Sequence, residues 1–128
     1  MDLVSAAFKI RRHYYGLTVK LNYLVNAKSG LCPEDCGYCS QSRDSTAAID
    51  RYPVMDEEEI IEQAEEAVAN KASTCCIVLS GRGPSEKEVD RVGSAVRTIK
   101  ERHPDLKICA CMGILRDGQA ERLREAGV

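Results

Sequence analysis

Thr74-Cys75-Cys76-Ile77-Val78-Leu79-Ser80-Gly81 lies just past the middle of this 128-residue chain and indicates its fold class. Residues 75–79 are all apolar, and polar or turn-forming residues stand on either side. A nearly continuous apolar run of this length is typical of a strand that is buried on both faces, as in parallel sheets. The stretch therefore predicts one strand of a parallel sheet.

A helix is predicted on each side of that strand. Asp56 and Glu59 before it, and Ser85 and Glu88 after it, have the spacing of capping boxes that begin helices. Apolar residues then recur three and four positions apart, which is the spacing of one buried helix face. The two apolar faces are Ile60, Ile61, Ala64, Ala67 and Val68 in the first helix, and Val89, Val92, Val96 and Ile99 in the second.

The same pattern continues toward both ends of the chain. Residues 18–27 alternate between apolar and polar and predict an earlier strand, and residues 106–112 predict a later one. An amphipathic helix is expected over 3–15, ending near Gly16. A last helix is expected near the C-terminus, with an N-cap, two apolar residues and a terminal glycine at Asp117, Ala120, Leu123 and Gly127.

This order, a leading helix and three strand–helix units, predicts an α/β fold with a parallel sheet and right-handed crossovers. Closed barrels of this kind typically take ~250 residues and eight units. We therefore expect residues 1–128 to form a single incomplete domain, the N-terminal portion of a TIM-type (βα) barrel.

The composition argues against several classes of partner. The chain has 18 basic and 20 acidic residues and a net charge of −2, so neither nucleic acid nor an anionic membrane is expected to bind it. No stretch approaches the ~20 apolar residues of a membrane span, and the first residues do not resemble a secretory signal. A cytoplasmic, reducing compartment is therefore expected, where the 7 cysteines are more typical of metal ligands or catalytic groups than of disulfides.

Three of the cysteines lie in one loop, Cys32-Pro33-Glu34-Asp35-Cys36-Gly37-Tyr38-Cys39, directly after the first predicted strand. Iron in iron–sulfur clusters takes soft thiolate ligands. Three cysteines so close together suit three irons of a cubane and leave the fourth iron open to an external ligand. The carboxyl ends of parallel strands are also where such folds bind ligands.

Two other interpretations of this loop stay open from the residues alone. A structural zinc site needs four ligands, and the nearest histidine, His13, stands 19 residues before Cys32. A redox pair formed by Cys36 and Cys39 leaves Cys32 without a role. The cluster interpretation uses all three cysteines.

Longer stretches carry a resemblance to a known family. The spacing Cys32-x3-Cys36-x2-Cys39, with Tyr38 before the last cysteine, resembles that of the radical S-adenosylmethionine superfamily. The surrounding sequence resembles the biotin synthase family more specifically, over about residues 6–128. The stretches that carry this resemblance are Lys20-Leu21-Asn22, residues 26–42, Ser80-Gly81-Arg82-Gly83-Pro84-Ser85 and Leu106-Lys107-Ile108-Cys109-Ala110-Cys111.

The resemblance implies an enzyme of the sulfurtransferase type. In that family a [4Fe–4S] cluster binds S-adenosylmethionine and cleaves it reductively to a 5′-deoxyadenosyl radical, which takes hydrogen atoms from dethiobiotin. A [2Fe–2S] cluster then supplies the sulfur that completes biotin. An electron donor such as flavodoxin or ferredoxin, and a homodimer, are implied as well.

The resemblance also implies roles for particular residues. Cys32, Cys36 and Cys39 would hold the [4Fe–4S] cluster, and Tyr38 would lie against the adenine of S-adenosylmethionine. Two ligands of the [2Fe–2S] cluster would be Cys76 and Cys109, and its remaining ligands would lie beyond Val128.

The predicted strands give the second cysteine pair independent support. Cys76 and Cys109 fall on successive strands, which lie ~4.8 Å apart in a sheet. Alternation places Cys76 on one face with Val78, and Cys109 on one face with Cys111. Cys75 and Cys111 are expected to be small buried apolar residues, as free cysteines commonly are.

A few positions depart from the family or stay without a role. Leu79 stands at a strand end near the expected S-adenosylmethionine site, where the family usually has alanine. Lys71 occupies a helix exit where glycine is usual, and Gly93 inside a helix costs about 1 kcal/mol relative to alanine. Arg82 suits either ligand binding or a solvated loop, and Lys28 has no assigned role. Two alternative functions are a truncated, non-catalytic iron–sulfur-binding fragment and a radical enzyme that acts on another small molecule.

Overall fold

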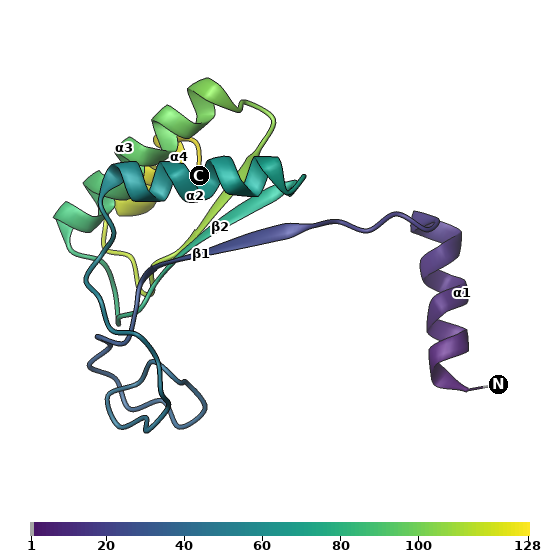
Figure 1. Cartoon of the computed structure of the whole chain (residues 1–128), viewed down its shortest axis with the longest axis horizontal. Coiled ribbons are helices and arrows are strands. Elements are labelled where there is room, and N and C mark those ends of the chain that lie inside the picture. Colours follow the sequence, from purple (N-terminus) through teal and green to yellow (C-terminus); the bar gives the residue numbers. More distant parts are fainter. Residues whose placement is uncertain (1) are drawn as a thin grey trace.

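The computed structural model describes residues 2–128 (Figure 1). In chain order its elements are α1 (Leu3–Tyr15), β1 (Asn22–Lys28), α2 (Glu57–Ala69), β2 (Thr74–Leu79), α3 (Glu86–Arg102), β3 (Lys107–Cys111) and α4 (Gln119–Ala126). The strands form one parallel sheet in the order β1-β2-β3. The predicted α/β order, a leading helix followed by three strand–helix units, is confirmed.

The two faces of the sheet have different surroundings. The helices α2, α3 and α4 lie together on one face (Figure 1). Cys75, Ile77 and Leu79 of β2 are buried toward that side, whereas Cys76 and Val78 are only half-buried on the other. The prediction that β2 is buried on both faces is therefore wrong. The apolar run has residues for two faces, but in the described part of the chain helices cover only one of them.

Both predicted capping boxes are present. The Asp56 carboxylate accepts the Glu59 N–H at 2.9 Å, and the Glu59 carboxylate accepts the Asp56 N–H at 2.9 Å. Ser85 and Glu88 make the same reciprocal pair at the start of α3. The capping residues that the sequence predicted therefore stand at the start of both helices.

The start of α4 differs from its prediction. Gly118, not Asp117, is the N-cap, and it has no side-chain hydrogen bond. The Gln119 side chain instead accepts the Arg116 N–H at 2.9 Å. Because the helix begins at Gln119, Ala120 points outward and is exposed. The residues that α4 buries against the core are Gln119, Leu123 and Ala126.

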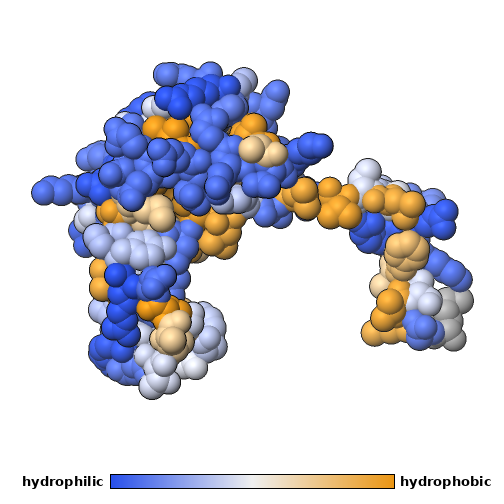
Figure 2. Space-filling view, in the orientation of Figure 1, coloured by the Kyte–Doolittle hydropathy of each residue, from blue (hydrophilic) through white to orange (hydrophobic). Residues whose placement is uncertain are grey.

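The first helix stands away from the sheet (Figure 1). No side chain of α1 is buried, and apolar residues of α1 and of the connector after it are uncovered, as the orange surface of Figure 2 shows. β1 begins at Asn22 and not at residue 18, because pairing with β2 begins at Asn22 opposite Thr74. Exposed apolar side chains of this region include Leu3, Val4, Phe8, Leu17 and Val19. None of the described helices is long and apolar enough to cross a membrane.

Candidate metal centre

The cysteine loop leaves the sheet at the carboxyl end of β1 and returns to the same place. Ser29 and Tyr52 exchange backbone hydrogen bonds of 3.2 and 3.1 Å, and the Met55 N–H donates to the Ala27 carbonyl at 2.8 Å. These contacts add a short antiparallel segment to the edge of β1. The loop between them is therefore held at the edge of the sheet where parallel α/β folds bind ligands.

Inside the loop, backbone turns order the last two cysteines. The Cys39 N–H donates to the Cys36 carbonyl at 3.1 Å, and the Arg43 N–H donates to the Glu34 carbonyl at 2.8 Å. Cys36 is exposed, Cys32 and Cys39 are half-buried, and all are free thiols. Three soft donors on one accessible loop fit the ligand set of an iron–sulfur cluster.

The loop supplies these donors without closing them around a common centre. Within residues 2–128, no three side chains of histidine, cysteine, aspartate or glutamate are grouped closely enough to hold a metal ion. The Tyr38 side chain is 94% exposed and stands clear of the rest of the loop. In a cubane each thiolate binds a different iron, so its three ligands do not need to converge on one ion.

A second pair of thiols lies on the open face of the sheet. Cys76 of β2 is the register partner of Cys109 of β3, and Leu24 of β1 is the partner of Cys76 on its other side. Burial, followed by a hydrogen bond with the Cys109 side chain, raises the pKa of Cys76 to about 12. The alternation that the sequence predicted for these strands is confirmed, and the two thiols are direct neighbours across the sheet.

The other two strand cysteines have opposite surroundings. Cys75 is fully buried on the helix-covered face, and burial raises its pKa to about 11. This confirms that Cys75 is a small core residue. Cys111 is exposed, so the prediction that it is buried is wrong. It shares the open face with Cys109, and no described element covers that face.

Leu79 points away from the open face of the sheet. It belongs to the buried core and is only 6% exposed, on the side of the sheet that the helices cover. The side chain that replaces the family's usual alanine therefore packs in the core and does not face the open side of the sheet. An odd-numbered position of β2 points to the helices because the side chains of a strand alternate between its faces.

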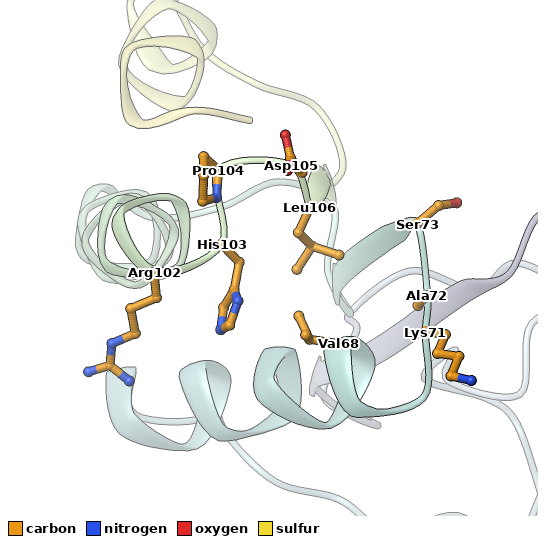
Figure 3. A pocket seen from close by; sticks show the side chains of 9 residues that line it. All are labelled: Val68, Lys71, Ala72, Ser73, Arg102, His103, Pro104, Asp105 and Leu106. Carbon is orange, nitrogen blue, oxygen red and sulfur yellow. The ribbon is translucent and has the colours of Figure 1, made fainter.

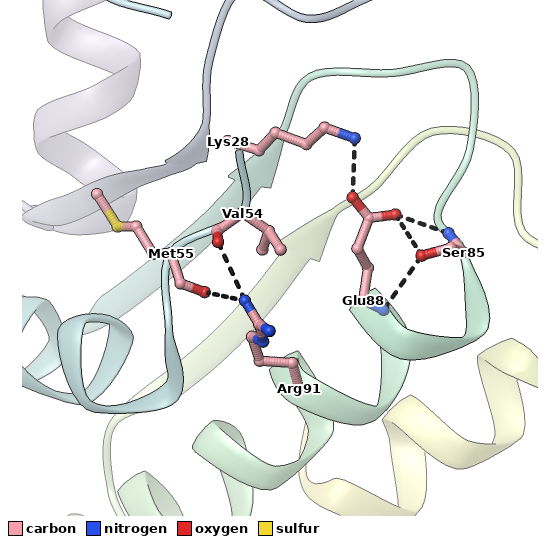
Figure 4. A network of polar contacts seen from close by, with 6 residues as sticks. All are labelled: Lys28, Val54, Met55, Ser85, Glu88 and Arg91. Carbon is pink, nitrogen blue, oxygen red and sulfur yellow. Dashed lines mark hydrogen bonds and ion pairs between the residues drawn. The ribbon is translucent and has the colours of Figure 1, made fainter. Parts of the chain in front are cut away.

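Two cations that the sequence left without a role each have a carboxylate partner. The Lys28 ammonium lies 2.8 Å from Glu88, which also accepts hydrogen bonds from the Ser85 N–H and hydroxyl (Figure 4). Arg82 lies 3.4 Å from Glu34 of the cysteine loop. The first contact ties the end of β1 to the start of α3, and the second ties the loop after β2 to the cysteine loop.

One hollow among the described residues lies away from these cysteines. It has a volume of about 510 Å³ and opens among residues that precede β2 and β3, such as Lys71, His103 and Leu106 (Figure 3). That is the amino end of the sheet. A smaller cleft of about 320 Å³ lies beside the cysteine loop and is lined by polar residues, among them Asn26, Gln41 and Tyr52.

Sequence reasoning missed the polar residues that hold the loop in place. Gln41, Asn26 and Tyr52 have no metal-ligand chemistry, so nothing in their type marked them. One signal was available, since Gln41 follows Cys39 by two positions and Asn26 is a polar residue inside a predicted strand.

Comparisons with known proteins identify the family of this chain. Residues 28–128 match the family model described as the radical SAM superfamily, where SAM is S-adenosylmethionine. The whole chain is 58% identical to a biotin synthase of Lysinibacillus sphaericus (strain C3-41) and 56% identical to one of Staphylococcus aureus (strain JH9). Each alignment covers 100% of this chain and 38% of the relative. The chain therefore spans well under half the length of these curated relatives.

A solved structure shares the fold. The crystal structure of methylornithine synthase (PylB) superposes with a TM-score of 0.76 at 27% sequence identity, over 97% of this chain and 35% of that one. The identity to the biotin synthases is about twice as high as this value.

Proposed function

The chain belongs to the radical SAM superfamily, and on that premise we propose that it is the S-adenosylmethionine-cleaving portion of a biotin synthase. The observation that carries this proposal is the register pairing of Cys76 with Cys109 on the open face of the sheet. A three-cysteine loop accounts for one cluster only. A second pair of adjacent thiols gives two ligands for another cluster, which a sulfur-inserting enzyme uses as its sulfur source.

In this proposal each group of residues has a separate task. Cys32, Cys36 and Cys39 would hold a [4Fe–4S] cluster, which, when bound, supplies the electron that breaks a carbon–sulfur bond of S-adenosylmethionine. The chain's own contribution is to present three thiols from one loop at the carboxyl edge of the sheet. Exposed Tyr38 would offer an aromatic face to the adenine, since aromatic rings stack on bases.

Cys76 and Cys109 would provide two ligands of a [2Fe–2S] cluster. Thiolates, not thiols, bind iron, so the proton that the raised pKa keeps on Cys76 has to leave when the cluster binds. Because no described element covers this face of the sheet, iron has access to both thiols.

The remaining parts of the proposal concern the whole enzyme. We propose dethiobiotin as the substrate, a flavodoxin or ferredoxin as the electron donor, and a homodimer as the assembly. Residues 1–128 would form one incomplete barrel domain of that enzyme. A cytoplasmic location is proposed because a reducing compartment keeps cysteines as free thiols.

Electron paramagnetic resonance tests the proposal. After anaerobic reconstitution and reduction with dithionite, the chain is expected to give a cubane signal that changes when S-adenosylmethionine is added. Cys32→Ala should abolish that signal. Cys76→Ala should leave it, because Cys76 is assigned to the other cluster, and so should the matched control Cys111→Ala. A cubane signal that S-adenosylmethionine does not change would overturn the assignment.

A further inference from the structure

One glutamine side chain bridges the two ends of the cysteine loop. Gln41 stands two positions after Cys39, and Gly30 stands two positions before Cys32. The Gln41 carboxamide oxygen accepts the Gly30 N–H at 3.0 Å. All three cysteines therefore lie inside a segment whose ends this one hydrogen bond joins.

The same carboxamide is also tied to the sheet. Gln41 Nε2 donates a longer hydrogen bond, 3.4 Å, to Asn26 Oδ1. Asn26 lies in β1 opposite Val78, and its carbonyl accepts the Tyr52 hydroxyl at 2.7 Å. The acceptor for Gln41 is thus itself held on both sides, by β2 and by the segment that returns from the loop.

Each end of the segment has a specific local conformation. Gly30 has a φ of 67°, and a Cβ there would lie inside 3.0 Å of the Arg51 side chain. At the other end, the Ser42 N–H donates to the Cys39 carbonyl at 3.2 Å, and Ser42 is buried. Gln41 therefore lies inside a hydrogen-bonded turn, between Cys39 and Ser42, that presents its side chain to Gly30.

We propose that Gln41 is a positioning residue that sets the spread of Cys32, Cys36 and Cys39 for cluster binding. This inference rests on the proposed function, since it concerns the same loop. Open loops leave their ligands at varied separations, and each conformation that must be frozen on binding weakens the site. A clamp across the loop ends removes part of that freedom before the cluster binds.

Three variants separate this role from a general effect on stability. Gln41→Leu keeps the side-chain size and removes both hydrogen bonds, and Gln41→Glu keeps the acceptor for the Gly30 N–H. Gln63→Leu is the matched control, because Gln63 lies on α2, away from the loop, and accepts a hydrogen bond from the Tyr23 hydroxyl of β1. Far-ultraviolet circular dichroism verifies that all three variants keep the fold.

Two measurements on the full chain give the answer. Loss of iron to a chelator is expected to be about five- to tenfold faster in Gln41→Leu, and within about twofold of wild type in Gln41→Glu and Gln63→Leu. In the metal-free chain, the Gly30 amide proton should exchange faster with solvent in Gln41→Leu than in wild type.

The outcomes are distinct. Equal iron loss in Gln41→Leu and wild type overturns the positioning role, even if Gly30 exchanges faster. Faster iron loss in Gln63→Leu as well would also overturn it, because the effect would then be general. A wild-type chain that takes up no cluster contradicts the proposed function. In that case the Gly30 exchange rate, measured without metal, still shows whether the clamp exists.

Discussion

At the scale of single residues, two glycines allow two loops to meet at the carboxyl edge of the sheet. The Ile114 N–H donates to the Arg82 carbonyl at 2.7 Å, which joins the loop after β3 to the loop after β2. A Cβ on Gly83 would lie inside 3.0 Å of the Ile114 carbonyl oxygen, and one on Gly113 would lie inside 3.0 Å of the Arg82 carbonyl oxygen. Backbone meets backbone here, so neither side has a flexible group that can yield.

Replacing the first of these glycines tests the contact. Gly83→Ala is expected to lower the free energy of unfolding by about 1–3 kcal/mol, because overpacking against a rigid neighbour forces the backbone to shift. Urea denaturation followed by circular dichroism measures it. Gly37→Ala is the control, since a Cβ there meets nothing within 4 Å. Equal stability of the two variants would show that the loops can separate freely.

At the scale of the elements, α3 has a capping box that stabilises its first turn and a glycine, Gly93, that destabilises its interior. Its capping box at Ser85 and Glu88 is complete, and Glu88 also binds Lys28 at the end of β1. Arg91, one turn further on, donates to the carbonyls of Val54 and Met55 (Figure 4). The helix is therefore joined to both the departing and the returning ends of the cysteine loop.

The weak position in α3 is Gly93. A Cβ there would meet only the Ala126 Cβ at 3.7 Å and the end of the Arg97 side chain at 3.7 Å, which are ordinary contacts. Gly93→Ala should therefore raise the free energy of unfolding by about 0.5–1 kcal/mol, since alanine loses less backbone entropy in a helix. Thermal denaturation measures the change. A lower midpoint would mean that α3 and α4 pack too closely to accept a methyl group.

The contact between Glu88 and Lys28 makes stability depend on pH. Burial by itself would raise the pKa of Glu88, but the hydrogen bonds from Lys28 and Ser85 outweigh it and hold this pKa below 4.5. A carboxyl whose folded pKa is lowered stabilises the fold above its unfolded pKa, and that stabilisation disappears as the pH falls through the folded value.

Glu88→Gln tests that dependence, because the amide does not titrate. The variant should unfold at lower urea concentration than wild type at about pH 7, and the difference should shrink toward about pH 3. Urea denaturation at a series of pH values gives the comparison. A difference that stays constant across this range would show that the charge of Glu88 contributes nothing.

At the scale of the whole molecule, packing is concentrated on one side of the sheet. The core lies between the strands and the three helices α2, α3 and α4, whereas Leu24 on the open face is 62% exposed. α1 adds a second uncovered apolar surface, as Figure 2 shows. Stability should therefore come almost entirely from the helix-covered face.

Deletion of residues 1–16 tests this asymmetry. Because α1 buries no side chain, the deletion should change the free energy of unfolding by less than about 0.5 kcal/mol. By contrast, Leu123→Ala, which empties a buried position of α4, should lower it by about 2–5 kcal/mol. Urea denaturation of the two variants beside wild type makes the comparison. A loss above about 1 kcal/mol on deletion would mean that α1 packs against the domain.

The sequence was enough for the order of elements and for the chemistry of the loop. Capping residues such as Asp56 and Ser85, and apolar spacing within each helix, act over three or four positions, so they can be read without knowing the fold. The three-cysteine loop is equally local. Lys71 was likewise identified as a position that favours glycine, and its φ is 58°.

Only the tertiary structure decided which surfaces are covered and which distant residues meet. Cys111 would be buried only if other elements covered the open face of the sheet. No local sequence pattern shows whether such elements pack there. The 2.8 Å contact of Lys28 with Glu88 joins residues 60 positions apart, and the Gln41 clamp depends on where the loop returns. Burial and long-range pairing are set by how the elements pack together, whereas caps and strand alternation follow from neighbouring residues along the chain.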